Sequence, residues 1–139
     1  MQPADKIKIL LADDEQDVLE LMAKKIAAAG FDVITAPDGE AAWERIVTDL
    51  PDILVLDLTM PKLDGFAVLK KLRENPPGGK WIPVIIVSAL GDVKDMERGM
   101  EMQADHYLVK PCPVEEILKG IRLMLALAPQ RRGTAEPGN

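Results

Sequence analysis

The chain has 139 residues, the size of one ordinary domain, with the 47% hydrophobic and 29% charged composition of a globular protein. Its 17 basic and 23 acidic residues give a net charge of −6. Because an acidic domain repels phosphate backbones, we expect no direct binding to nucleic acid. Cys112 is the only cysteine, which excludes an intramolecular disulfide and a cysteine-based zinc site. No segment approaches 18 uninterrupted apolar residues, and the amino terminus lacks a signal-peptide pattern, so we expect a cytoplasmic domain without membrane contact.

Short aliphatic runs recur along the chain and predict five strands, at residues 7–11, 33–36, 53–56, 84–87 and 107–109. The runs at 53–56 and 84–87 are apolar at every position. A strand that is apolar throughout is covered on both faces, which is typical of a parallel sheet.

The segments between these runs have helical spacing. After the first run one apolar stripe contains Val18, Leu21, Met22, Ile26 and Ala29, and Gly30 is placed to end that helix. The last helix shows a similar stripe, made of Val114, Ile117, Leu118, Ile121 and Leu125. Five strands alternating with five helices predict an α/β fold with a doubly wound sheet. The domain is expected to span 1–127, and 128–139 are interpreted as a flexible tail or a severed linker, because they lack periodicity.

Polar residues follow the predicted strands. Ligands of open α/β sheets bind beyond the carboxyl ends of the strands. Asp13 and Asp14 follow the first strand and Asp57 the third, and then Ser88 and Lys110 follow the fourth and fifth. We therefore expect three carboxylates, one hydroxyl and one ammonium group to meet at one edge of the sheet.

Three carboxylates so close together need a counter-charge. Two like charges about 4 Å apart cost about 4 kcal/mol at an effective dielectric constant near 20. Lys110 offsets one charge, and the remaining oxygens suit a hard divalent ion, for which Mg²⁺ fits best and Mn²⁺ is the alternative. A carboxylate beside such an ion can attack phosphorus and form an aspartyl phosphate.

Each of these residues has a simpler interpretation when it is taken singly. Asp13 or Asp14 alone is more often the N-cap of a helix. Asp57 and Ser88 alone suit a loop and a turn, and Lys110 alone a solvated surface. Their joint occurrence, each at the carboxyl end of its own predicted strand, favours the functional interpretation.

The chain resembles the receiver domains of two-component response regulators, in the form of a single-domain, chemotaxis-regulator-like protein, over residues 6–127. The resemblance rests on an ordered set of short stretches. They are Ile-Leu-Leu-Ala-Asp-Asp-Glu at 9–15, Asp-Ile-Leu-Val-Leu-Asp-Leu-Thr-Met-Pro at 52–61, Asp-Gly at 64–65, Val-Ser-Ala at 87–89 and Tyr-Leu-Val-Lys-Pro at 107–111. It implies a flavodoxin-like sheet with strand order 2-1-3-4-5.

The same resemblance assigns roles at the metal site. Asp57 would be the phosphoacceptor, and Asp13 and Asp57 would bind Mg²⁺ directly. Asp14 would act through water, and the backbone carbonyl of Thr59 would be a further ligand. Thr59 and Leu90 stand at the positions that tune hydrolysis of the phosphoryl group in the family. The bulky Leu90 predicts a long-lived phosphoprotein.

Further roles concern the phosphoryl group and the switch. Ser88 would donate a hydrogen bond to the phosphoryl group, Lys110 would pair with it, and Tyr107 would rotate inward on activation. The peptide bond before Pro111 would be cis. Many family members carry glycine where Gln103 stands, so Gln103 is expected to adopt a positive φ.

The only histidine and three methionines of the fourth helix lie outside the predicted site. His106 is the only histidine and precedes a strand, which favours a strand-edge role over phosphotransfer. Met96 and Met100 have core spacing on the fourth helix. Met102 lies off that stripe and is assigned neither to the core nor to a partner surface.

The leading hypothesis is a phosphorylation-controlled signalling module, not an enzyme, which assists its own phosphorylation and dephosphorylation. Its donor would be a histidine kinase or a phosphotransfer protein. Its downstream partner would bind the face made by the fourth helix, fifth strand and fifth helix. We expect a monomer or a phosphorylation-dependent dimer.

Two alternatives have less support. A Mg²⁺-dependent phosphatase using Asp57 as nucleophile would resemble the haloacid dehalogenases, which place an acid two residues later, where Thr59 stands. A receiver-like scaffold that is not phosphorylated would lack the acceptor, a metal-binding acid or the lysine, and the chain carries all of them.

Overall fold

The computed structural model describes residues 6–135, with the surroundings of side chains through residue 127. Five parallel strands form one sheet in the order β2-β1-β3-β4-β5. They are β1 (Lys8–Ala12), β2 (Asp32–Ala36), β3 (Ile53–Leu56), β4 (Val84–Ser88) and β5 (His106–Val109). The predicted parallel sheet and its strand order are confirmed.

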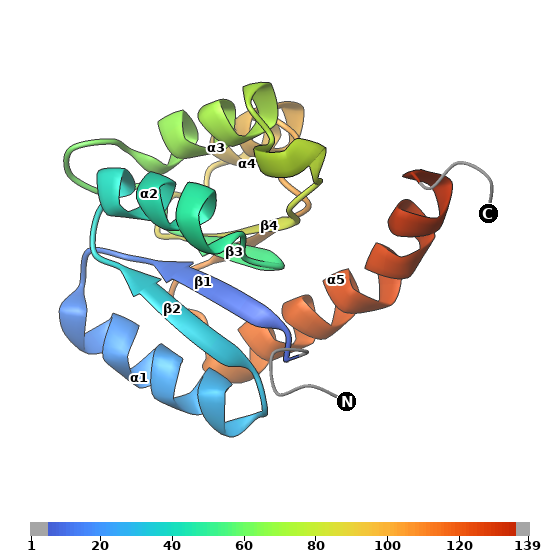
Figure 1. Ribbon diagram of the computed structural model, residues 1–139. Coiled ribbons are helices and arrows are strands. Elements are labelled where there is room, and N and C mark those ends of the chain that lie inside the picture. The colour runs from blue at the N-terminus through green and yellow to red at the C-terminus, as the bar shows by residue number, and fades with distance from the viewer. Residues whose placement is uncertain (1–5, 136–139) are drawn as a thin grey trace.

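Five α-helices cover the two faces of this sheet (Figure 1). Helices α1 and α5 lie on one face, and α2, α3 and α4 lie on the other. Their bounds are α1 (Gln16–Ala28), α2 (Gly39–Asp49), α3 (Gly65–Glu74), α4 (Val93–Glu101) and α5 (Val114–Ala135), with a short 3₁₀ helix η2 (Pro77–Gly79) before β4. Among the described residues, no helix combines the length and apolarity that crossing a membrane requires.

The central strands are buried because each face has its own apolar layer. In β1, Leu10 packs in the cluster under α2 and α3, whereas Ile9 and Leu11 pack in the cluster under α1 and α5. Every residue of β3 and β4 is buried. The continuous apolarity of residues 53–56 and 84–87 follows from this two-sided cover.

Helix α1 ends where predicted, but its buried stripe differs from the prediction. Gly30, just beyond the helix, has a φ of 104° that suits glycine. The buried side chains are Leu19, Met22 and Ile26, whereas Leu21 is 54% exposed. Leu19 was missed because residues 18, 19, 21 and 22 all fit apolar spacing, and only the rotation of the helix on the sheet selects among them.

Helix α4 also departs from the prediction. Met96 and Met100 were expected in the core but are 36% and 50% exposed. The buried residue of α4 is Gly99, where an added Cβ would lie 3.0 Å from Cδ1 of Ile86 and 3.2 Å from Cδ2 of Tyr107. The helix therefore approaches the sheet through its smallest residue and turns the two methionines outward.

Residues 128–135, expected to belong to a flexible tail or a severed linker, continue the backbone of α5. Extending an existing helix costs little per residue, and Gln130, Arg131 and Arg132 are good helix formers. Residues 136–139 lie outside the described part of the chain. In Figure 1, the C-terminal end of α5 projects beyond the body of the domain.

Candidate functional site

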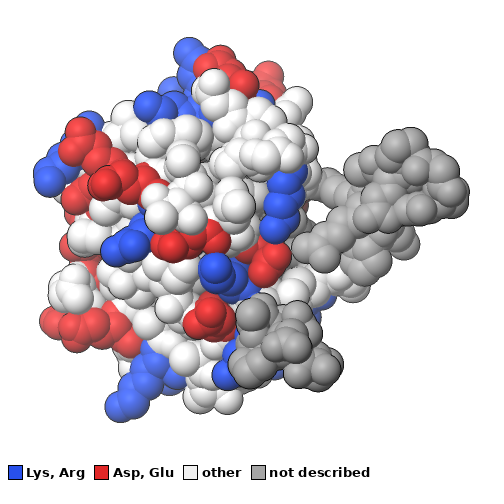
Figure 2. All heavy atoms as spheres, in the orientation of Figure 1, with Lys and Arg blue, Asp and Glu red and all other residues white. Residues whose placement is uncertain are grey.

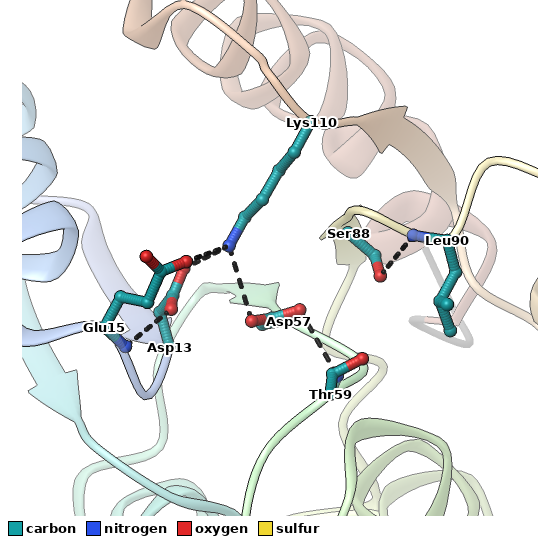
Figure 3. A network of polar contacts seen from close by, with 7 residues as sticks. All are labelled: Asp13, Glu15, Asp57, Thr59, Ser88, Leu90 and Lys110. Carbon is teal, nitrogen blue, oxygen red and sulfur yellow. Dashed lines mark hydrogen bonds and ion pairs between the residues drawn. The ribbon is translucent and has the colours of Figure 1, made fainter.

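The predicted site residues meet at the carboxyl edge of the sheet, because backbone hydrogen bonds continue past the ends of the strands. The amide of Asp57 donates to the carbonyl of Ala12 over 2.9 Å, and the amide of Lys110 donates to the carbonyl of Ser88 over 2.8 Å. These bonds hold Asp57 level with the end of β1 and Lys110 level with Ser88 at the end of β4, and the pairing of Leu56 with Ile86 joins the two halves of the edge. Figure 3 shows the side chains of Asp13, Asp57 and Lys110 converging there.

Lys110 connects the carboxylates of the site. Its Nζ lies 2.8 Å from Oδ2 of Asp13, 3.4 Å from Oδ2 of Asp57 and 3.7 Å from Oε1 of Glu15. The side chains of Asp13 and Asp57 are only 4% and 7% exposed. Each also accepts a backbone hydrogen bond: Oδ1 of Asp13 from the amide of Glu15, and Oδ1 of Asp57 from the amide of Thr59.

Three acids of the site could hold a metal ion. Asp13, Asp14 and Asp57 each offer a carboxylate oxygen, and these oxygens all lie within 4.8 Å of one another. Asp13 and Asp57 are buried, and Asp14 is exposed to solvent. One ammonium group cannot balance three carboxylates, and an all-oxygen donor set fits a hard divalent cation.

The pKa directions agree with this excess of negative charge. Burial raises the pKa of the Asp57 carboxyl above its usual value; Lys110 opposes this shift, and the neighbouring Asp13 adds to it. Burial would lower the pKa of the Lys110 ammonium, but its bonds and attraction to Asp13 and Asp57 outweigh burial and raise it. Lys110 therefore stays charged beside the two acids.

Ser88, Leu90 and Tyr107 form a second group on the other side of Asp57. The Ser88 side chain is fully buried, and its Oγ accepts a hydrogen bond of 3.1 Å from the amide of Leu90. The Tyr107 hydroxyl donates to the carbonyl of Leu90. Burial raises the pKa of this phenol, and Asp95 contributes. The backbone of Leu90 is thus held by the side chains of Ser88 and Tyr107.

Of the remaining predicted residues, Thr59, Leu90 and Pro111 lie beyond the carboxyl ends of the strands, whereas Gln103 and His106 lie at the opposite end of β5. The Thr59 and Leu90 side chains are exposed, and the Lys110–Pro111 peptide bond is cis. His106 is the first residue of β5, as expected for a strand edge. Gln103 has a φ of 70°, which confirms the positive value expected from its sequence position.

Two site residues were not identified from the sequence. Glu15 makes the third carboxylate contact to Lys110. Its place in the run Asp-Asp-Glu at 13–15, next to the predicted acids, was the signal that could have identified it. Gly65 packs directly on the end of β3: an added Cβ would lie 2.3 Å from the carbonyl oxygen of Asp57 and 2.6 Å from Cα of Leu58. Only three-dimensional packing shows that requirement.

Comparison with known proteins agrees with this geometry. Residues 9–122 match the family model described as the response regulator receiver domain. The chain belongs to this family. The match includes every predicted site residue, and its boundaries are close to the 6–127 expected from the motifs. It places the protein among signalling modules.

Its relatives include transcriptional regulators. The chain is 41% identical over 120 residues to the probable transcriptional regulator ycf27 of Porphyridium aerugineum, covering 86% of this chain and 48% of that protein. It is 37% identical over 118 residues to the alkaline phosphatase synthesis transcriptional regulatory protein PhoP of Bacillus subtilis, covering 85% and 48%. The chain therefore spans about half the length of the curated relatives it matches.

Solved receiver domains share the fold over nearly their whole length. The receiver domain of Francisella response regulator 1452 matches with a TM-score of 0.79 and 34% identity, covering 85% of this chain and 95% of that one. The BeF3-activated N-terminal receiver domain of Klebsiella pneumoniae RstA matches with a TM-score of 0.75 and 29% identity, covering 84% and 96%.

Proposed function

We propose that this receiver domain accepts a phosphoryl group on Asp57 from a histidine kinase or phosphotransfer protein, with Mg²⁺, and thereby switches a protein-binding face. The observation that carries the proposal is the placement of Asp57. Its buried carboxylate lies 3.4 Å from the Lys110 ammonium and within 4.8 Å of carboxylate oxygens of two further acids that could share a metal ion with it.

The chemistry needs few groups. An oxygen of Asp57 attacks phosphorus, the bond from phosphorus to the donor nitrogen breaks, and the leaving imidazole keeps that electron pair. Lys110, 3.4 Å from Asp57 in the resting state, would pair with a phosphoryl oxygen. Asp13, Asp14, Asp57 and the Thr59 carbonyl would hold Mg²⁺, which neutralises phosphoryl charge when it is bound.

The switch would begin at Ser88. A hydroxyl can accept and donate at once, so Ser88 can donate to a phosphoryl oxygen on Asp57. If the Ser88 side chain moves toward the phosphoryl group, it pulls on Leu90, because the Leu90 amide donates a hydrogen bond to the Ser88 hydroxyl. The Tyr107 hydroxyl holds the carbonyl of the same Leu90, so this loop couples the phosphorylation site to Tyr107.

The output surface would be the α4–β5–α5 face. Tyr107 lies on β5 under Gly99 of α4, and the exposed Met96 and Met100 of α4 offer adaptable apolar contacts. Figure 2 shows the opposite side of the molecule, around β2 and α2, where basic and acidic side chains are interspersed. The net charge of −6 and the exposed methionines of α4 favour a protein partner, a phosphorylation-dependent second copy included, over nucleic acid. The transcriptional role in the relatives' names would then belong to the half of their length that this chain does not match.

Magnesium titration with beryllofluoride, followed by amide NMR, tests the proposal. Mg²⁺ alone should shift residues near Asp13 and Asp57, and adding beryllofluoride should shift Ser88, Tyr107 and α4. Asp57→Asn should abolish the shifts caused by beryllofluoride. Asp32 is an exposed acid at the far end of β2, and Asp32→Asn should keep the shifts caused by Mg²⁺ and by beryllofluoride. Shifts confined to the metal site, with none at Tyr107 or α4, would contradict the switch. An absence of any Mg²⁺ effect would contradict the site itself.

A further inference from the structure

Glu15 occupies an unusual position at the site. Its amide is held by Asp13 over 2.9 Å, which fixes its backbone beside the acceptor pocket. As the N-cap residue of α1 it could cap that helix, but its side chain makes no capping bond. Instead the carboxylate turns toward Lys110, as Figure 3 shows, and lies 3.7 Å from Nζ.

The charge of Glu15 is in excess of what the proposed reaction needs. Glu15 is not among the three acids whose oxygens could share one metal ion. A divalent ion and Lys110 together would balance those three carboxylates, so Glu15 adds one net negative charge. Lys110 also lies closer to Asp13 and Asp57 than to Glu15, which leaves this carboxylate weakly paired.

Glu15 also lies on the side from which a donor must arrive. The Asp57 side chain is 7% exposed, whereas that of Glu15 is 65% exposed. Since Asp57 attacks phosphorus from the buried side, the leaving group departs in line with it, toward solvent. A carboxylate at this rim therefore interacts with the charge of the leaving group as well as with the phosphoryl oxygens.

We propose that Glu15 is a specificity-determining residue for phosphoryl transfer, favouring donors with a cationic nitrogen leaving group over acyl phosphates. The inference rests on the proposed function of Asp57. A protonated phosphoramidate or phosphoimidazole carries positive charge on the nitrogen that leaves, which Glu15 attracts. Acetyl phosphate is a dianion with a carboxylate leaving group, which Glu15 repels. Asp57 gains the phosphoryl group in both cases, while the P–N or P–O bond breaks and its electron pair leaves with the amine or acetate.

Phosphorylation rates with both small donors test this inference. The full chain is incubated with Mg²⁺ and either phosphoramidate or acetyl phosphate, and phosphoprotein is followed by intact mass over time. Glu15→Gln should raise the rate with acetyl phosphate relative to phosphoramidate by about threefold at low ionic strength, and the difference should shrink in high salt. Glu20→Gln removes the same charge from an exposed site further along α1 and should leave the ratio unchanged.

The outcomes separate the two proposals. An unchanged ratio in Glu15→Gln, or equal changes with both donors, would overturn the role of Glu15 while leaving Asp57 as the acceptor. A wild-type protein that takes no phosphoryl group from either donor would overturn the proposed function and this inference with it.

Discussion

Nε of Arg73 donates a hydrogen bond of 3.0 Å to the carbonyl oxygen of Gln103, which lies in the turn between α4 and β5 and has a φ of 70°. The same guanidinium donates to the carbonyl of Ile82 over 2.9 Å and to Asp105 over 3.0 Å, and its Cζ lies 3.7 Å from the centre of the Trp81 ring. Arg73 of α3 thus holds the turn that leads from α4 into β5, at the end of the sheet opposite the acidic site.

We expect Asp105→Asn to lower the free energy of unfolding by about 3 kcal/mol, because it leaves the Arg73 charge beside a neutral partner. The two side chains are 9% and 4% exposed, so solvent screens their attraction little. Urea unfolding measures the change. Glu116→Gln, which removes the acid of the exposed Lys119 pair, should cost less than about 0.5 kcal/mol. Equal losses in the two variants would contradict the buried role of Asp105.

Gly65→Ala should impair phosphorylation at Asp57 more than it impairs folding. The added Cβ would lie 2.3 Å from the Asp57 carbonyl oxygen, so the end of β3 and the start of α3 must shift relative to each other, which displaces Asp57. We expect at least about a tenfold slower reaction with acetyl phosphate, since misplacement by about 1 Å can cost as much as a hundredfold. Gly30→Ala, with open space but a φ of 104°, should lose stability and keep the rate. A normal rate in folded Gly65→Ala would refute this positioning role.

Asp57→Asn should stabilise the protein at neutral pH. Burial raises the folded pKa of Asp57 above its usual value of 3.8, so the wild type loses stability as the pH rises through that folded pKa. The difference in unfolding free energy between variant and wild type should therefore be present at pH 7 and should disappear as the pH falls below about 3.8. Thermal unfolding across this range measures it.

Asp38→Asn is the matched control, and we expect it to lower the stability of the protein at pH 7. The amide of Ala41, together with Lys62, lowers the pKa of Asp38, so the wild-type carboxylate stabilises the fold above pH 3.8, and this contribution is lost as the pH falls. A destabilised Asp57→Asn at pH 7 would contradict the pKa direction assigned to Asp57.

Leu90→Ala should shorten the lifetime of the phosphoprotein severalfold. Leu90 lies next to the Ser88 loop with its side chain at the exposed rim of the site, where a bulky apolar group hinders approaching water. Loss of the phosphoryl group after removal of the donor can be followed by intact mass. Leu21→Ala, on the exposed face of α1, should leave the lifetime unchanged. An unaltered decay in Leu90→Ala would exclude Leu90 as a barrier to water.

Much of the fold could be predicted because local pattern and burial agree. Residues 53–56 of β3 and 84–87 of β4 are apolar without interruption, and a parallel sheet explains these runs whatever the details of packing. The sheet topology then brings Asp13, Asp57 and Lys110 to one edge. Their arrival at this edge follows from the topology, but the contact of Lys110 with Asp13 also requires the lysine side chain to extend past β4 and β3.

What could not be predicted depends on how the elements rotate and pack. Leu19 and Leu21 both fit the apolar spacing of α1, yet only Leu19 is buried. On α4, the sequence favoured burial of Met96 and Met100, whereas the contact of Gly99 with Tyr107 turns them outward. Glu15 was overlooked for the same kind of reason, because nothing in its spacing shows that its side chain turns toward Lys110.

The most direct test of the account is the intact mass of the protein after incubation with acetyl phosphate and Mg²⁺. We predict a gain of one phosphoryl group in the wild type, and none in Asp57→Asn or when Mg²⁺ is removed with a chelator. Asp32→Asn should be labelled like the wild type. A phosphoryl group that persists in folded Asp57→Asn, or a wild type labelled equally well without a divalent ion, would contradict the account.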